Sequence, residues 1–97
     1  MTIRHVVLFE PLETASDDDL NTLVNTLRSF SAIPGVSHLA AGLDFSLRSE
    51  YRVSFTCDFE STDALQAYLD HPDHQAVVTG YLPTVVKQGW KVVDFEF

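Results

Sequence analysis

A strand over residues 3–10 is the first element that the hydrophobic pattern predicts: one face is apolar except for His5, and the other is apolar at its centre. Both of its faces carry apolar residues, and a strand that is apolar on both sides is normally covered on both sides. Helices can cover one face, so the face with Val6 and Leu8 is expected to meet a partner chain. His5 lies on the more apolar face and is expected to be at least partly buried, either as an ordinary core histidine or as part of a site.

A helix is predicted to follow this strand. Ser16 is a good N-cap, and Asp17, Asp18 and Asp19 fill the first turn, where negative charge is favourable beside the helix dipole. This capping role accounts for the acidic triplet without a metal ion. Leucine, valine and phenylalanine then recur at helical spacing as far as Phe30, which predicts one buried stripe facing a core.

Three further strands complete the pattern, at residues 36–41, 51–60 and 90–97. With the two helical segments, the order is strand, helix, strand, strand, helix, strand, which is the ferredoxin-like split βαβ arrangement. It predicts a single α+β domain with a four-stranded antiparallel sheet and both helices on one face. The first and third strands are expected to be central and the last strand to lie at an edge.

Two residues of these strands, Asp94 and Cys57, have side chains that could take part in chemistry. Asp94 shares a face with Trp90 and Val92, and a buried carboxylate without a partner costs several kcal/mol, so a histidine partner is expected. Cys57 lies on the apolar face of its strand, and no basic residue adjoins it in sequence to lower the pKa of its thiol. We therefore expect Cys57 to be buried and unreactive.

A break between two helices is predicted around Pro72. His71 precedes this proline and is disfavoured in the helical conformation, so one helix is expected to end near Asp70 and another to begin with Pro72 in its first turn. His74 would lie in or near that turn, where the helix dipole keeps an imidazole neutral. Tyr68 of the preceding helix could face it and form an acid–base pair. The alternative is that Tyr68 is a core aromatic residue and His74 a helix cap.

Length, charge and cysteine content limit the possible functions. The 97 residues are 45% hydrophobic and suit one globular domain, residues 1–97. Fourteen acidic and six basic residues give a net charge of −8, and the absence of a basic patch argues against nucleic-acid binding. No apolar run is long enough to span a membrane. The single cysteine and the absence of a signal-peptide pattern predict a reducing, cytoplasmic location.

Five segments resemble the stress-responsive A/B barrel (Dabb) family of dimeric α+β barrel proteins. They are IRHVVLF from Ile3, IPGV from Ile33, GLDFS from Gly42, FESTDALQAYLDHPDH from Phe59, and the closing VVDFEF. The resemblance covers nearly the whole chain, and the fourth segment is its most specific part. It implies a homodimer in which two sheets pack face to face, which would cover the second apolar face of the first strand.

The resemblance also implies site residues. In a plant polyketide cyclase of this family, which closes a linear polyketide without a cofactor, the catalytic tyrosine and histidine match Tyr68 and His74. A histidine of its first strand matches His5, and an aspartate of its last strand matches Asp94. A pocket histidine of that cyclase falls at Val53 here, and many other pocket positions differ, so the substrate does not transfer.

Three functions remain open. In the first, a pocket between sheet and helices binds a small hydrophobic or aromatic compound, and His74 abstracts a proton next to a carbonyl while Tyr68 stabilises the enolate, without a cofactor. In the second, the chain is a non-catalytic structural or stress-response dimer. In the third, two histidines and Asp94 ligate a metal, although their spacing is not typical of metal sites. His5 is expected to be a third catalytic group of the pocket. The residues expected to contact the substrate are Asp94, Val7, Val53, Phe55, Trp90 and Val92.

Overall fold

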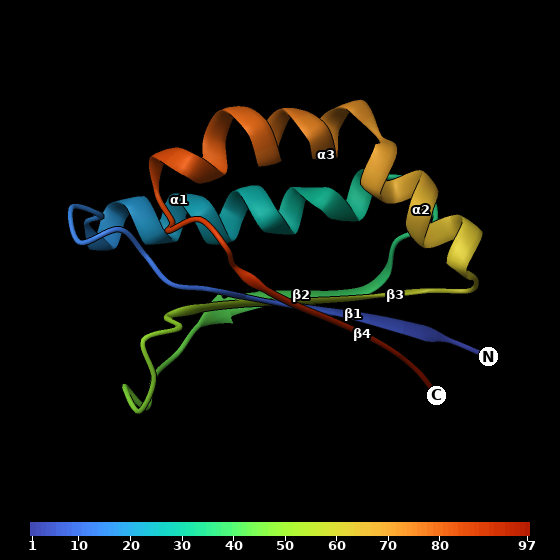
Figure 1. Cartoon of the computed structure of the whole chain (residues 1–97), viewed down its shortest axis with the longest axis horizontal. Coiled ribbons are helices and arrows are strands. Elements are labelled where there is room, and N and C mark those ends of the chain that lie inside the picture. Colours follow the sequence, from blue (N-terminus) through green and yellow to red (C-terminus); the bar gives the residue numbers. More distant parts are fainter.

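The computed structural model describes residues 1–97 and contains one sheet with a layer of helices over one of its faces (Figure 1). The order of strands and helices is the one predicted from the hydrophobic pattern, with the second helical segment divided into two. The elements in chain order are β1 (Ile3–Phe9), α1 (Asp17–Arg28), β2 (Ser37–Leu43), β3 (Val53–Phe59), α2 (Thr62–Asp70), α3 (Pro72–Ala76) and β4 (Lys91–Glu96).

The sheet is antiparallel and has the strand order β2-β3-β1-β4. The central position of β1 and β3 and the edge position of β4 confirm the ferredoxin-like prediction. The register places Cys57 of β3 and Asp94 of β4 directly opposite His5 of β1. Side chains at paired positions point to the same face of a sheet, so all three point toward the helices.

The core lies between this inner face of the sheet and the helices. Helix α1 begins at the predicted cap, where the Ser16 hydroxyl accepts from the Asp19 amide and the Asp19 carboxylate accepts from the Ser16 amide. Its apolar stripe then packs on the alternating apolar residues of β1 and β3. The most deeply buried side chains of this core are Tyr68, Phe55, Phe59, Leu23, Leu27, Val53, Val86 and Cys57.

The chain between α3 and β4, which contains Gly80 and Pro83, is irregular. It continues α3 as a π-helical turn, Val77–Tyr81, and then as a 3-10 turn, Leu82–Thr84. Proline lacks an amide hydrogen and cannot continue the α-helical bonding pattern. A second 3-10 turn, Ser29–Ala32, follows α1.

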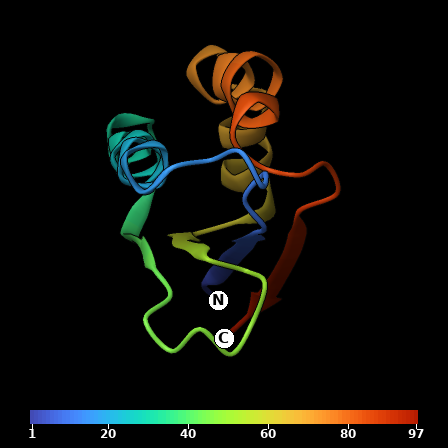
Figure 2. The ribbon, with the colours of Figure 1, turned by 90° about the vertical axis from the view of Figure 1, so that its left-hand side faces the viewer.

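The opposite face of the sheet has no helix over it (Figure 2). Large apolar side chains are therefore left in solvent on the edge strand, where Val93 is 58% and Phe95 45% exposed, and Phe97 beyond it is 56% exposed. Soluble monomers seldom expose a contiguous apolar surface of this kind. We call the surface formed by the following residues the open face: Arg4, Val6, Leu8, Val93, Phe95 and Phe97.

Strand β2 departs from the sequence-based boundaries. The prediction was residues 36–41, whereas the strand covers Ser37–Leu43 and has an irregular register with β3 between Ser37 and Ala40. His38 lies in this irregularity with a φ of 49°, a conformation that alternation of side chains does not reveal. His38 is exposed, and its ring lies near the carboxylate of Asp58 on the side away from the helices. None of the helices is long and apolar enough to cross a bilayer.

Candidate functional site

The break between α2 and α3 has the geometry that Pro72 predicts. Helix α2 ends at Asp70, His71 is extended with φ −62° and ψ 137°, and Pro72 begins α3. The His71 ring caps the new helix, because its Nδ1 accepts the Asp73 amide at 3.1 Å. This capping role of His71 was not predicted, although its position before a first-turn proline was a signal for it.

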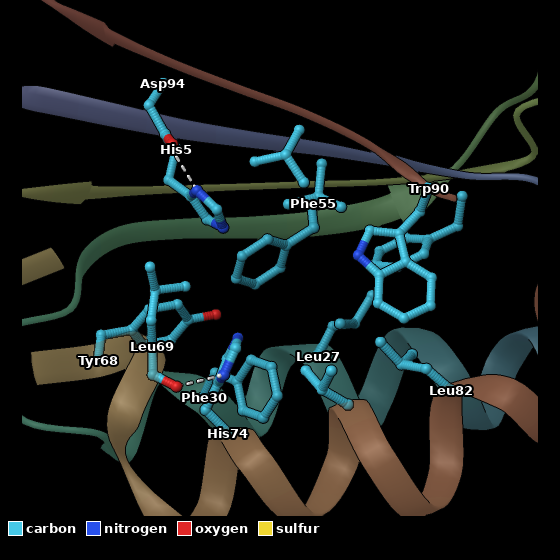
Figure 3. Close-up of a pocket in the computed structure, with 14 residues that line it drawn as sticks. His5, Leu27, Phe30, Phe55, Tyr68, Leu69, His74, Leu82, Trp90 and Asp94 are labelled. Carbon is cyan, nitrogen blue, oxygen red and sulfur yellow. Dashed lines mark hydrogen bonds and ion pairs between the residues drawn. The ribbon is translucent and has the colours of Figure 1, made fainter. Parts of the chain in front are cut away.

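A cavity of about 160 Å³ lies beside this break, between the helices and the inner face of the sheet (Figure 3). Eleven of its fourteen lining residues are hydrophobic, and neither lysine nor arginine is among them. The wall of the cavity is therefore mostly apolar. Its groups that can exchange protons are the side chains of His5, Tyr68, His74 and Asp94. The lining residues are His5, Val7, Phe9, Leu27, Phe30, Phe55, Tyr68, Leu69, His74, Val78, Leu82, Trp90, Val92 and Asp94.

His74 projects into this cavity from α3. Its Nδ1 lies 3.1 Å from the carbonyl oxygen of Leu69, at the end of α2. A carbonyl can only accept, so Nδ1 carries the proton and Nε2 keeps the lone pair of the neutral ring. In Figure 3 the second nitrogen of His74 points away from Leu69 and into the cavity. The bond to the carbonyl therefore prepares His74 to accept a proton from a ligand.

The pKa of His74 is lowered, mainly because burial disfavours the charged ring. The Leu69 carbonyl opposes this by stabilising the protonated form, and the nearby His5 and His71 lower the pKa further. The lowered pKa has the predicted direction, and its largest cause is burial, whereas the sequence pointed to the dipole of the helix that carries His74. Helix α3 has only five residues, and desolvation in the apolar cavity dominates.

Tyr68 comes from the last turn of α2 and faces His74. The centroids of the two rings are 4.5 Å apart, and the Tyr68 hydroxyl points into the cavity (Figure 3). Its ring is 1% exposed, and burial raises the pKa of the phenol well above its ordinary value. Tyr68 therefore stays protonated over the physiological pH range and can donate a hydrogen bond into the cavity.

His5 and Asp94 form the opposite polar wall of the cavity. Asp94 Oδ1 lies 2.5 Å from Nδ1 of His5, so the expected histidine partner of this carboxylate is present. His5 is buried, whereas the side chain of Asp94 is 39% exposed, which is more than the sequence led us to expect. The reason is that Asp94 belongs to an edge strand, which no further strand covers on its outer side.

The predicted apolar lining is correct at four of five positions: Val7, Phe55, Trp90 and Val92 border the cavity. Val53, which was also expected to line the pocket, does not border the cavity. Val53 pairs with Phe9 and Leu43 at the first residue of β3, where it is completely buried in the core. Alternation identified the correct face of the strand but not which position along it borders a cavity.

Several residues that line the cavity were not predicted. Leu27 and Phe30 belong to the apolar stripe that was assigned to the core, and that stripe was the signal that could have found them. Leu69 takes part through its backbone carbonyl, a contribution that residue type does not reveal. Val78 and Leu82 come from the irregular segment after α3.

The geometry does not support the metal triad that was left open. The Nδ1 atoms of His5 and His74 are already bonded, to Asp94 and to a backbone carbonyl, and no three histidine, cysteine, aspartate or glutamate side chains are arranged to hold a metal ion. Cys57 is fully buried, and burial raises the pKa of its thiol to about 12. The candidate groups for proton transfer in the cavity are therefore Tyr68, His5 and His74.

Solved structures share this architecture over nearly the whole chain. A dimeric ferredoxin-like protein of unknown function from Thermobifida fusca is 30% identical, with a TM-score of 0.85 over 100% of this chain and 92% of its own. A Dabb family protein with a ferredoxin-like fold from Mesorhizobium loti is 30% identical, with a TM-score of 0.81 over 99% of this chain and 96% of its own.

A hydroxynitrile lyase from Passiflora edulis has the same fold at 14% identity, with a TM-score of 0.82 over 97% of this chain and 91% of its own. At this level of identity the likeness concerns the fold alone. The sequence itself matches the model of the stress responsive A/B barrel domain, Dabb, over residues 3–97. The chain belongs to the Dabb family.

Proposed function

We propose that the cavity is a cofactor-independent acid–base site for small neutral carbonyl compounds, in a chain that works as a homodimer. One observation carries the proposal: a neutral histidine and a protonated tyrosine meet in a cavity that is apolar apart from these two residues and the His5–Asp94 pair. The bond from His74 to Leu69 fixes which ring nitrogen is the acceptor. Such a pair suits proton abstraction next to a carbonyl group.

In the proposed reaction, Nε2 of His74 takes a proton from the carbon next to the carbonyl. The electrons of the broken C–H bond move to the carbonyl oxygen, and the Tyr68 hydroxyl donates a hydrogen bond to the enolate that forms. The enolate carbon then forms a bond to a second carbonyl carbon of the ligand, as in an aldol closure. The π electrons of that carbonyl move to its oxygen, which takes the proton from His74; without closure, the enolate carbon takes the proton back from His74. His5, held by Asp94, presents its free nitrogen from the other side of the cavity.

The size and charge of the cavity support a particular class of ligand. A cavity of roughly 150 Å³ accommodates a benzene-sized ring, and this one measures about 160 Å³. Its lining offers no lysine or arginine to pair with a carboxylate or a phosphate. Aromatic rings on several sides, among them Phe30, Phe55 and Trp90, favour a flat apolar body. A neutral compound with one ring, or a chain of similar size, is the proposed ligand.

The proposed dimer forms through the open face. This face exposes Val93 and Phe95 without a covering helix, and the Thermobifida fusca relative is a dimeric protein. Burial of apolar surface contributes about 25 cal/mol per Å², so two such faces gain stability by packing on each other. A dimer without catalysis, in which Tyr68 and His74 only hold the helix junction, is the alternative function.

Hydrogen exchange in the ligand tests the proposed chemistry directly. Cyclic and aryl ketones in D₂O are followed by NMR for loss of the proton next to the carbonyl, with wild-type protein, His74→Ala and Tyr68→Phe. We expect catalysed exchange by the wild type and a loss of 10²-fold or more, on the order of a general-base contribution, in His74→Ala. His38→Ala is the matched control, because His38 is exposed on the other side of the sheet.

Two results would contradict the proposed site. Exchange at the same rate in His74→Ala and in the wild type would remove His74 from the reaction. No exchange and no binding with any compound, together with strong destabilisation by both pocket substitutions, would favour the non-catalytic dimer. Loss of a buried hydrogen bond destabilises a protein by about 1–3 kcal/mol, which thermal or chemical unfolding detects.

A further inference from the structure

Residues 44–52, which we call the arm, connect β2 and β3 and project from the sheet on the side away from the helices (Figure 1 and Figure 2). Two large apolar side chains of the arm have almost no protein around them. Phe45 is 95% exposed and Leu47 is 66% exposed. Within a single chain this arrangement loses the free energy that burial of a Phe and a Leu normally provides.

The arm is held in a defined shape by its own hydrogen bonds. The Asp44 amide donates to the carbonyl of Arg52 at 2.8 Å, which closes the base of the arm. The Asp44 carboxylate accepts from the Ser46 hydroxyl at 2.9 Å and from the Leu47 amide at 2.8 Å. Leu47 has a φ of 57°, a left-handed conformation that is costly for a leucine. The backbone is thus ordered around side chains that have nothing to pack on.

The open face by itself is a small interface. Four strands about 4.8 Å apart and about 24 Å long present a flat area on the order of 450 Å². Stable protein–protein interfaces bury about 800 Å² of accessible surface on each partner. Because side chains project from the face, its accessible area is larger than its flat area. A projecting segment that adds contacts would bring the buried area closer to that of a stable interface.

Charge also permits the arm to approach a second copy of the chain. The chain as a whole has a net charge of −8. Within the arm, Asp44 and Glu50 are balanced by Arg48 and Arg52, so the arm is formally neutral. Contact between the arm and another copy therefore adds little like-charge repulsion, whereas most other parts of this acidic surface would add more.

From these observations we infer that the arm of one protomer docks on the partner protomer, where Phe45 and Leu47 cover apolar surface next to the partner's open face. The partner is a second copy of this chain, because the arm projects on the same side of the sheet as the open face, which no helix covers. The inference rests on the homodimer of the proposed function. It assigns to the arm a contact that the sheet faces alone do not supply.

Dissociation of the dimer on dilution, followed by sedimentation velocity, tests the arm. We expect Phe45→Ser to raise the dimer Kd at least tenfold while the far-UV circular dichroism of each protomer is unchanged. The control is Asn25→Ser, a change at an exposed position of α1 in the helix layer, which should leave the Kd unchanged.

Leu47→Gly is a second variant that keeps the test valid if Phe45→Ser disturbs the loop. Glycine adopts a φ of 57° without cost, so this change relaxes the arm while it removes an apolar contact. We expect a weaker dimer whose protomers keep the far-UV circular dichroism of the wild type. A dimeric wild type with the same Kd as both arm variants would overturn the arm contact alone. A monomeric wild type at micromolar concentration would overturn the arm contact and the proposed homodimer together.

Discussion

His5 and Asp94 lie opposite each other on neighbouring antiparallel strands, and Nδ1 of the histidine is 2.5 Å from Oδ1 of the aspartate. The carboxylate accepts, so the histidine donates from Nδ1 whether its ring is neutral or charged. The other ring nitrogen is left for the cavity (Figure 3). The backbone register of two strands thus sets the direction of the His5 side chain.

Replacement of Asp94 by alanine should lower stability modestly. The bond to His5 is lost, but the carboxylate is partly exposed and screened by water, so we expect a loss of about 1 kcal/mol, or a Tm lower by about 4–8 °C. Asp94→Asn should lose less, because the amide oxygen still accepts from Nδ1. Glu96→Ala, two residues along the same strand, is the control. A lower Tm for Glu96→Ala than for Asp94→Ala, measured by calorimetry, would contradict this account of the pair.

The fold was predictable from the sequence because its determinants are local or periodic. The break at Pro72 follows from the steric effect of proline on the preceding residue, and the central and edge strands follow from the order of elements. The convergence of Tyr68 and His74 was predictable for the same reason, since the break places two helix ends beside each other. Their catalytic roles stay a prediction.

Features that depend on three-dimensional packing were not predictable. Whether a position on the inner face borders a cavity or lies in the core depends on which side chains cover it. Val53 was therefore assigned to the cavity, although it lies in the core. Asp94 was expected to be more buried than its edge position allows. The low pKa of His74 was attributed to a helix dipole, whereas the main cause is desolvation among side chains from several elements. Alternation in sequence contains no information on these distances.

The pKa of His74 predicts a specific pH dependence. Proton abstraction needs the neutral ring, and the pKa lies below the ordinary 6.5, so activity should be retained as pH falls below 6.5 and lost through the lowered pKa. The unfolded chain binds the proton more readily, so His74 also reduces stability as pH falls below 6.5. NMR titration of the ring measures the pKa. A His74→Phe variant should unfold with a weaker pH dependence in this range, and an unchanged dependence would contradict the assignment.

Cys57 should react slowly with thiol reagents in the folded protein. Its side chain is fully buried, and burial raises the pKa of the thiol to about 12, so almost no thiolate exists near neutral pH. Labelling in native buffer should proceed many times more slowly than in denaturant, where the pKa returns to its ordinary value. Fast labelling of the native protein would require an open path to Cys57 and would restore a nucleophilic cysteine as a candidate.

A charge on the open face should separate the proposed dimer. Leu8 lies on this face in the central strand β1, so Leu8→Glu would place two unpaired carboxylates in the interface, at a cost of several kcal/mol. We expect a monomer by light scattering at micromolar concentration, or a dimer that unfolds at a lower temperature. Thr56→Ser, a mild change on the neighbouring strand, should stay dimeric. A stable Leu8→Glu dimer would show that the protomers associate through another surface.

Tyr68→Phe separates a functional site from a packing role most sharply, because it removes one oxygen and keeps the ring. The ring is buried against Phe59 and His74, with centroids 5.0 and 4.5 Å away, so packing should survive the change. The hydroxyl points into the cavity, so stability should change by less than about 1 kcal/mol. The rate of proton abstraction should fall by a factor of about 10²–10³, as for the loss of one donor to an oxyanion. If Tyr68→Phe instead lowered the Tm by more than about 8 °C and left exchange unaffected, the hydroxyl would be a structural group and His74 would act without it.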